Sequence, residues 1–361
     1  MTETHTIQAA DLLELTAGIL RKNGLPEPDA RIVADSLVDA DLRGVSSHGV
    51  LRMETYLQRL NNRVMNPTPQ LKTIAETAAT AVLDGDNGFG QVASQRAVDI
   101  LLAKTKDTPL AAVSVRNSNH FGAAAYWAAQ LAEHDLIGVT VSNVEPLMPA
   151  PGGAEAKIGN NPLSVVVPAL SHRPIVVDMA TSVVPLGKIL NAKSKGEAIP
   201  EGWGVDSSGQ PTTVPDDVIN GGSLFPVGGP KGYGLAIIVE VLSALLSGGE
   251  FGTDIHSMYQ ELESPNRISH FFMAIKVSAF LDPQIFKASV DRYIDQIKSS
   301  ALAPGSDAIR MPGEIELRAK DRNTQNGISL PSSVAEGLVA LARNAGVSQD
   351  LIHNLHTVPT A

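Results

Sequence analysis

Five short runs rich in β-branched residues recur between about residue 78 and residue 190, and alanine-rich stretches separate the first three. The runs are Thr80–Leu83, Leu110–Val115, Ile137–Val141, Leu163–Val167 and Ile175–Asp178. The alanine-rich stretches have helical spacing and cover residues 91–105 and 122–134. Strands that alternate with helices are typical of an α/β domain whose crossover helices cover a sheet. The sequence therefore predicts a central α/β domain, which we place over residues 76–300.

Helical patterns flank this domain at both ends of the chain. Residues 10–65 carry apolar residues at helical spacing in three segments, and Pro67 then breaks the pattern. A last segment with helical spacing covers residues 332–344. We therefore expect an N-terminal helical lobe over residues 1–75 and a separate C-terminal segment over residues 301–361.

The composition limits the classes of partner and of chemistry. Acidic residues (38) outnumber Lys and Arg (28), and the net charge of −10 offers no basic surface for nucleic acid or a membrane. The chain has no cysteine, which excludes disulfides, thiol nucleophiles and cysteine-ligated metals. No apolar run reaches the length of a membrane span, and the first residues are unlike a secretory signal. We expect a soluble, cytoplasmic protein.

Two histidines stand in similar local sequences. His48 lies in Gly-Val-Ser-Ser-His-Gly (residues 44–49), and His120 lies in Asn-Ser-Asn-His-Phe-Gly (residues 117–122). Each follows small polar residues and opens a segment with helical spacing, where the helix dipole favours an uncharged imidazole. Neutral imidazoles can exchange a proton with a substrate near neutral pH. The alternative is a pair of surface histidines near helix caps.

Arg52 follows His48 by four residues, so an α-helix would place both on one face. Ser46 or Ser47 would cap this helix. A guanidinium grips a carboxylate through two parallel hydrogen bonds, and a neighbouring imidazole can then serve the oxygen on the adjacent carbon. A 2-hydroxy or 2-keto acid needs this pairing. A capped helix with a surface arginine is the alternative.

Several segments suit a dinucleotide. The free N–H groups of residues 122–124 could hold a pyrophosphate. The glycine-rich loop around Lys231 (residues 228–234) could receive a phosphate or a ribose, and its alternative interpretation is a flexible surface loop. Asp178 ends a predicted strand, where it could accept the ribose hydroxyls or cap the next helix.

One further pattern points toward a Rossmann domain, but its context does not. Gly88-Phe-Gly90-Gln-Val-Ala93 matches Gly-x-Gly-x-x-Ala, with Asp107 following. No mononucleotide-binding half precedes it, and Asp107 lies in a lysine-rich turn beyond a helix. We interpret these glycines as a structural turn. The histidines also lack metal-ligand spacing such as His-Glu-x-x-His, so no metal site is predicted.

Six segments stand in the order typical of one enzyme family across residues 10–330. They are Asp41–Arg52, Asn119–Gly122, Gly159–Pro162, Val177–Ser182, Gly229–Leu235 and Pro312–Glu314. Together they resemble the malate/L-lactate-type NAD(P)-dependent dehydrogenases, a family that includes ureidoglycolate, sulfolactate and diketogulonate enzymes and cyclic imino-acid reductases. The resemblance implies a fold without a Rossmann domain. A mixed β-sheet would bind the cofactor, and a helical lobe would form from both chain ends, with residues 301–361 packed on it.

The resemblance also implies a homodimer and roles for individual residues. His120, or His48 supported by Ser47, would be the acid/base, and Arg52 would bind the substrate carboxylate. The residues expected to contact the cofactor are His120, Phe121, Gly122, Ala123, Ala124, Asp178, Met179, Ala180, Lys231, Gly313 and Glu314.

Two positions depart from the family's pattern. Asn160 stands where the family often has threonine, so that an amide replaces a hydroxyl contact to the substrate. Lys188 stands where the imino-acid reductases carry an acidic residue, which favours a hydroxy acid over a cyclic imine. We therefore predict hydride transfer between the nicotinamide of NAD, or alternatively of NADP, and C2 of a small 2-hydroxy acid. NADPH-dependent imino-acid reduction and nucleotide binding without turnover are the alternatives.

Overall fold

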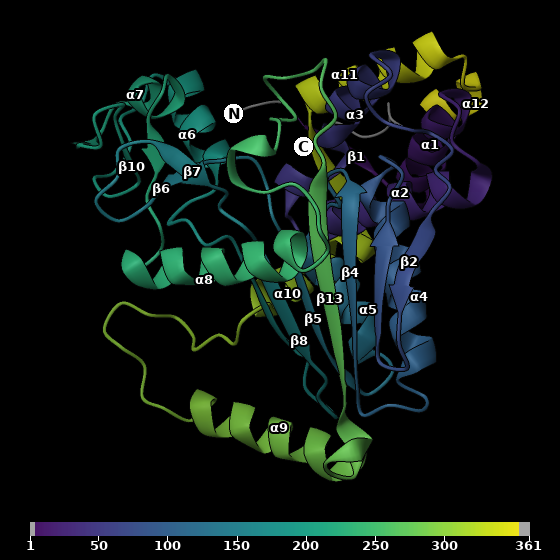
Figure 1. The fold of residues 1–361 in the computed structure, drawn as a ribbon, viewed down its shortest axis with the longest axis vertical. Helices are drawn as coiled ribbons and strands as arrows, with labels where there is room; N and C mark the ends of the chain where they lie inside the picture. The colour runs from purple at the N-terminus through teal and green to yellow at the C-terminus, as the bar shows by residue number, and fades with distance from the viewer. Residues whose placement is uncertain (1–3, 354–361) are drawn as a thin grey trace.

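A seven-stranded mixed sheet forms the centre of the computed structural model, which describes residues 4–353 (Figure 1). The strand order is β2-β3-β4-β13-β5-β8-β9. The strands span Lys72–Glu76 (β2), Thr80–Asp84 (β3), Leu110–Ser118 (β4), Ile268–Lys276 (β13), Leu136–Ser142 (β5), Leu163–Val167 (β8) and Ile175–Met179 (β9). Within this sheet β3 and β4 pair in parallel, and the other neighbours are antiparallel. A Rossmann sheet is mostly parallel, so the predicted non-Rossmann mixed sheet is confirmed.

The five predicted strands all form, but the sheet is not a simple series of crossovers. Helix α5 (Ala124–Ala132) connects β4 to β5, and β13 lies between these two strands, antiparallel to both. Phe271 of β13 pairs with Ser114 of β4 on one side and with Val141 of β5 on the other. The crossover prediction was incomplete, because local spacing does not show which distant strand joins a sheet.

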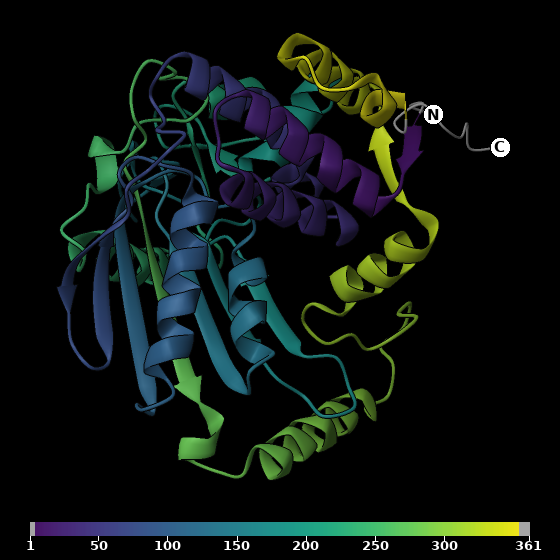
Figure 2. The same ribbon diagram turned by 90° about the vertical axis from the view of Figure 1, so that its right-hand side faces the viewer.

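Helices cover both faces of the sheet. Helices α4 (Gly90–Lys104) and α5 pack on one face, where Trp127 is completely buried (Figure 2). Gly138 of β5 allows α5 to approach closely, since a Cβ there would lie 2.4 Å from a carbonyl oxygen of the helix. Helix α8 (Pro230–Glu240) and the π-helical turn η3 (Val241–Leu245) lie across the opposite face.

Both ends of the chain build the helical lobe. Its helices are α1 (Ala9–Lys22), α2 (Glu27–Leu42), α3 (Met53–Asn61), α10 (Glu314–Asn326), α11 (Ser332–Ala345) and α12 (Gln349–His353). Strand β1 (Thr4–Ile7) pairs with β14 (Ile328–Pro331). Leu12 and Leu37 share one hydrophobic core with Leu338. The expected lobe formed from both chain ends is therefore confirmed, while the domain limits at residues 75 and 300 stay a prediction.

A smaller lobe groups short elements around its own core. They are β6 (Met148–Pro149), β7 (Ala156–Ile158), α6 (Leu186–Lys195), β10 (Gly204–Val205), β11 (Pro211–Thr212), α7 (Pro215–Ile219), β12 (Ser223–Leu224) and the 3₁₀ turn η4 (Gly252–Asp254). Val184, Ile189 and Leu224 are buried together there. This lobe stands beside the helical lobe, above the sheet in the view of Figure 1.

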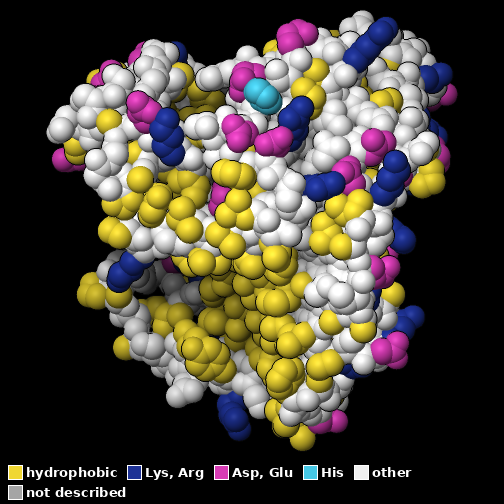
Figure 3. All heavy atoms as spheres, in the orientation of Figure 1, with side chains coloured by type: hydrophobic (Ala, Val, Ile, Leu, Met, Phe, Trp, Pro, Cys, Tyr) yellow, Lys and Arg dark blue, Asp and Glu magenta, His cyan; other side chains and the backbone are white. Residues whose placement is uncertain are grey.

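Large apolar side chains remain exposed on two helices. After the turn η5 (Val277–Ala279), α9 (Pro283–Lys298) lies at the far end of the molecule, where Ile285 and Tyr293 are each 57% exposed. On α8, Ile238 is 56% exposed. Figure 3 shows a broad hydrophobic surface running from α8 down over the sheet toward α9. Within residues 4–353, no helix combines the length and the apolar character that crossing a membrane requires.

Candidate active site

The segment that carries His48 and Arg52 is not the start of an α-helix. It forms two 3₁₀ turns, η1 (Ser46–His48) and η2 (Val50–Arg52), and α3 begins only at Met53. The expectation that both side chains share the first turns of one capped α-helix is therefore wrong.

Asp41 of α2 holds the chain between these two turns. Gly49 lies against the Asp41 carboxylate, where a Cβ would be only 2.0 Å from a carboxylate oxygen. The same carboxylate accepts a hydrogen bond of 2.8 Å from the Val50 N–H, which replaces an intrahelical bond. Burial raises the pKa of Asp41 to about 7. A close glycine and a buried acid thus interrupt the helix that the apolar spacing predicted.

The turns place His48 beside His120, which lies in the loop between β4 and α5. The two imidazoles are nearly parallel, with centroids 5.5 Å apart and an interplanar angle of 27°. Ser47 Oγ lies 3.0 Å from Nδ1 of His48. Both imidazoles keep part of their surface exposed, so a small molecule can reach them. The structure therefore brings together the two histidines singled out in the sequence.

Tyr56 of α3, which was not predicted, positions His120. Its hydroxyl lies 2.7 Å from Nδ1 of His120 and accepts a hydrogen bond of 3.0 Å from Gln91 Nε2. Nδ1 also accepts a hydrogen bond of 3.4 Å from the Gly122 N–H, which favours the neutral tautomer with its proton on Nε2. Nε2 of His120 makes no hydrogen bond with any described residue, which leaves it for a substrate. Tyr56 follows Arg52 by four residues, and that spacing was the signal available in the sequence.

Arg52 lies beside the histidines and is partly anchored. Its Nε donates to the Ser47 carbonyl oxygen at 2.6 Å. Its Nη1 donates to the Tyr259 hydroxyl, and the guanidinium carbon is 5.2 Å from the centroid of that ring. Nη2 has no hydrogen-bond partner among residues 4–353, so it remains available for a carboxylate. Tyr259 comes from a distant loop and was not predicted.

Burial and positive charge keep both imidazoles neutral. Desolvation and the Arg52 guanidinium lower the pKa of His48 to about 4. Desolvation, followed by the charges of His48 and Arg52, holds the pKa of His120 well below its usual range. A substrate carboxylate next to Arg52 would offset the guanidinium charge and raise both pKa values. In the absence of an acid, the site therefore holds two neutral imidazoles beside one cation.

A second group of predicted residues meets at the end of β9. Desolvation by the surrounding protein atoms raises the pKa of Asp178 to about 6, although part of its side chain is exposed. The Ala125 N–H at the start of α5 contacts the carboxylate and opposes this rise. The Val176 N–H donates to the Pro312 carbonyl oxygen at 3.1 Å. Gly313 packs so closely that a Cβ would lie 2.4 Å from Cβ of Val176. Three of the predicted cofactor segments are therefore neighbours.

Backbone hydrogen bonds connect this place to two more predicted segments. The Thr181 N–H donates to the Asn160 carbonyl oxygen at 3.0 Å. The Thr181 carbonyl oxygen in turn accepts a hydrogen bond of 2.8 Å from the Val227 N–H. The Asn160 amide donates to Ser182 Oγ at 3.2 Å. Lys231, the second residue of α8, follows this strand-like connection and is exposed.

These neighbours fit a dinucleotide. The Ala125 N–H already contacts Asp178, which leaves the N–H groups of Ala123 and Ala124, at the start of α5, for a phosphate. Thr181 Oγ1 is buried and has no hydrogen-bond partner within residues 4–353, as expected for a group that a ligand satisfies. Gly90 has another use: a Cβ there would lie 2.1 Å from the Asn119 carbonyl oxygen. The glycine pattern at residues 88–93 therefore lets α4 pack against the loop before His120.

Glu314 is engaged within the protein. Burial alone would raise the pKa of this carboxyl, but hydrogen bonds from Lys298 Nζ at 2.6 Å and the Met311 N–H at 3.1 Å lower it to about 2. Arg318 also donates to it. A cofactor contact by this turn would have to come from its backbone. Within residues 4–353, no group of three or more His, Asp or Glu side chains is placed to hold a metal ion.

Comparisons with known proteins identify the family of the chain. A family model described as malate/L-lactate dehydrogenase matches residues 7–339. The chain belongs to the malate/L-lactate dehydrogenase family. The malate dehydrogenase of Pyrococcus abyssi is 40% identical over an alignment of 344 positions that covers 93% of this chain and 94% of that protein. The NAD(+)-dependent ureidoglycolate dehydrogenase of Escherichia coli K12 is 31% identical, over 92% of this chain and 95% of that one.

Solved structures of family members share the fold. The sulfolactate dehydrogenase of Methanocaldococcus jannaschii superposes with a TM-score of 0.90 and 37% identity, covering 98% of this chain and 100% of that one. The Δ1-piperideine-2-carboxylate reductase of Pseudomonas syringae superposes with a TM-score of 0.85 and 27% identity, covering 93% and 99%. The chain is therefore an oxidoreductase of the 2-hydroxyacid dehydrogenase class, which uses a nicotinamide cofactor, and the predicted enzyme class is confirmed.

Proposed function

We propose that the enzyme transfers a hydride between NAD and C2 of a small 2-hydroxy acid. Arg52 binds the C1 carboxylate, and His120 exchanges the proton of the C2 oxygen. The observation that carries this proposal is the meeting of His48, His120 and Arg52 in one site. The nicotinamide, when bound, accepts or supplies the hydride. Residues 120–124, Asp178–Ala180 and Lys231 would hold the cofactor.

The protein's own residues organise the proton transfer. Tyr56 keeps Nδ1 of His120 hydrogen-bonded. Nε2, on the opposite side of the ring, is then the nitrogen that exchanges a proton with the substrate. His48 is supported by Ser47 and, by its proximity, lowers the proton affinity of His120 until an acid binds. Asn160 would add an amide contact to the substrate. His120 is preferred to His48 as the proton carrier because it has the Tyr56–Gln91 relay behind it.

An assay of the pure protein with a pool of 2-keto acids tests this function. We expect NADH absorbance to fall, and we expect kcat/KM for NADH to exceed that for NADPH. The reason for NAD preference is the Asp178 carboxylate, which would repel a 2′-phosphate on a ribose that it contacts. If the absorbance of neither cofactor changes with any 2-hydroxy or 2-keto acid, the proposal is rejected.

Arg52→Lys should raise KM for the acid about 10–100-fold while leaving KM for the cofactor nearly unchanged. Lysine keeps the charge but lacks the planar pair of donors that matches a carboxylate. Steady-state kinetics with each substrate varied in turn will check this. Equal increases in both KM values would contradict the assignment of Arg52 as the carboxylate contact.

We also propose a homodimer in which a second copy covers the apolar surface of α8, of the turn after it, and of the part of the sheet that these leave exposed. Ile238 and Leu246 are 56% and 59% exposed there, and exposed apolar patches of this kind mark interfaces. Sedimentation should give twice the 38.0 kDa chain mass, and Ile238→Asp should shift the equilibrium toward monomer. A wild-type protein that sediments as a monomer at micromolar concentration would reject the dimer.

Reduction of a cyclic imino acid is the second candidate, because the Δ1-piperideine-2-carboxylate reductase shares the fold over almost the whole chain. Lys188 argues against it, since its Nζ lies 5.8 Å from the centroid of the Trp203 ring, where a cation rather than an acid is placed. A cyclic imine added to the same assay separates the two candidates, because only a reductase of imino acids would prefer it to every keto acid.

A further inference from the structure

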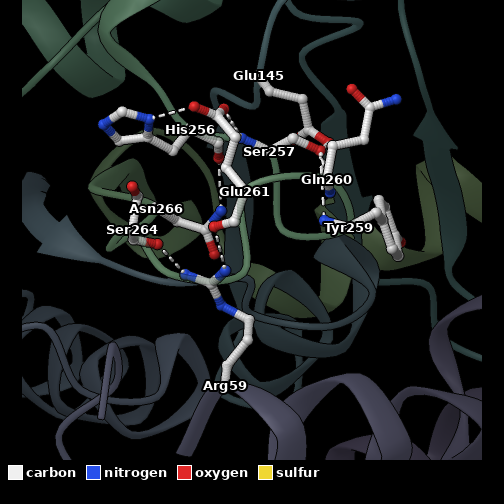
Figure 4. Close-up of polar contacts among 9 residues, drawn as sticks. All are labelled: Arg59, Glu145, His256, Ser257, Tyr259, Gln260, Glu261, Ser264 and Asn266. Carbon is white, nitrogen blue, oxygen red and sulfur yellow. Dashed lines mark hydrogen bonds and ion pairs between the residues drawn. The ribbon is translucent and has the colours of Figure 1, made fainter. Parts of the chain in front are cut away.

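Tyr259, whose hydroxyl accepts a hydrogen bond from Arg52, is also part of the wall of a cavity of about 410 Å³. Glu145, which lies between β5 and β6, forms one wall, and residues 257–261 form another. Apolar residues of α6 and α7, among them Leu186 and Val218, line the remainder. Figure 4 shows the Glu145 side chain directed toward Ser257 and Tyr259. The cavity is large enough for the side chain of a small acid whose C1 carboxylate is held by Arg52.

The Glu145 carboxylate is buried but weakly satisfied. It is 9% exposed, and its hydrogen bonds come from Ser257 Oγ at 3.3 Å and from the N–H of Glu145 itself. It forms no salt bridge with any residue of the described range 4–353. Desolvation raises the pKa of Glu145, while its own N–H, Ser257 and the charges of Arg52 and Arg59 oppose this rise. A buried carboxylate with so few partners is costly unless a ligand completes its hydrogen bonds.

Two other charged side chains near this cavity, Glu261 and Arg59, already have hydrogen-bond partners within the protein. Glu261 accepts hydrogen bonds from the Ser257 N–H at 2.8 Å and contacts His256 Nδ1 at 2.7 Å. Arg59 is completely buried and donates to the Ser264 carbonyl oxygen at 2.9 Å, which fixes the loop (Figure 4). The described residues that line the cavity include two carboxylates and no Lys or Arg. Glu145 is therefore the acceptor left open to a ligand.

We propose that Glu145 selects 2-hydroxy acids whose side chain ends in an uncharged hydrogen-bond donor, such as an amide or a ureido group, over acids that end in a second anion. This inference rests on the proposed function, because Arg52 must hold the C1 carboxylate for the side chain to enter the cavity. A distal N–H would satisfy Glu145. A distal carboxylate or sulfonate would meet a like charge at short range in a poorly solvated cavity whose described lining residues include no Lys or Arg.

L-Malate and its β-amide form a matched pair for the test, since they differ only in a carboxylate against an amide of nearly equal size. We expect wild-type kcat/KM for the β-amide to exceed that for L-malate about tenfold or more. Glu145→Gln should bring the ratio close to one, mainly by lowering KM for L-malate. L-Lactate, which has no distal group, serves as the reference substrate, and its kcat/KM should change little. Glu336→Gln, at an exposed position of α11, controls for loss of a negative charge.

Two results would overturn the inference while leaving the dehydrogenase in place. One is a wild-type preference for L-malate over its β-amide. The other is an equal loss for all three acids in Glu145→Gln, which would give Glu145 a purely structural role. If none of the acids, L-lactate included, is oxidised with either cofactor, the proposed function is wrong, and this inference, which rests on it, is wrong as well.

Discussion

Replacing His120 with alanine is expected to lower kcat about 10²–10⁴-fold, the range typical of a positioned acid/base group. The imidazole is kept neutral in the free enzyme, its Nδ1 is held by Tyr56, and its Nε2 is open to a substrate. Stopped-flow or steady-state measurement of NADH oxidation will give the loss in turnover. His134→Ala, which changes an exposed histidine at the end of α5, is the matched control and should keep wild-type activity.

The His48 variant decides between the two histidines. We expect His48→Ala to reduce turnover less than His120→Ala, because His48 contacts Ser47 and lacks the Tyr56–Gln91 relay. A large loss in His48→Ala together with wild-type turnover in His120→Ala would reverse the two assignments. Wild-type turnover in both variants would remove the histidine pair from the mechanism.

The second large effect concerns stability in acid. His270 of β13 is completely buried, is stacked 4.5 Å from the Phe121 ring, and lies 2.9 Å and 3.1 Å from the hydroxyls of Ser142 and Ser118. Desolvation lowers its pKa from 6.5 to about 3. A base with a lowered pKa in the folded state contributes stability above the unfolded value of 6.5 and loses it as the pH falls. Between pH 6.5 and about pH 4 this one group should remove about 3 kcal/mol from the free energy of unfolding.

Urea unfolding at a series of pH values will measure this loss. His270→Gln removes the titrating group, so its free energy of unfolding should depend less steeply on pH over the same interval, even if it is less stable at pH 7. The slope with urea concentration should stay constant, which shows that the unfolded state is unchanged. Parallel pH profiles for the wild type and His270→Gln would assign the acid sensitivity to other groups.

Sequence patterns predicted the local elements of the fold better than their arrangement. The five β-branched runs became strands, and the family motifs led to the mixed sheet and the lobe from both chain ends. The helix expected after Ser47 did not form as predicted, because its interruption depends on Asp41, whose carboxylate approaches from another helix. The position of β13 depends likewise on pairing with two strands far away in sequence.

The same limit applies to the site. His48, His120 and Arg52 stand in recognisable motifs, and the structure brings them together. Tyr259 and Glu145 carry no such local signal, since each is an ordinary side chain until the loop at residues 256–266 folds against α3. Residues that shape the cavity for a particular substrate are therefore the hardest to find from sequence, because distant segments supply them.

The central place of β13 sets a condition on how this protein is made. On the ribosome, β4 and β5 emerge long before residues 268–276. Until β13 is made, the edges of β4 and β5 that will pair with it have unpaired backbone groups. Sheets that depend on such distant pairing fold slowly and expose strand edges during synthesis. The chain therefore completes its sheet only when most of it has been translated, and fragments that end before Ile268 should aggregate rather than fold.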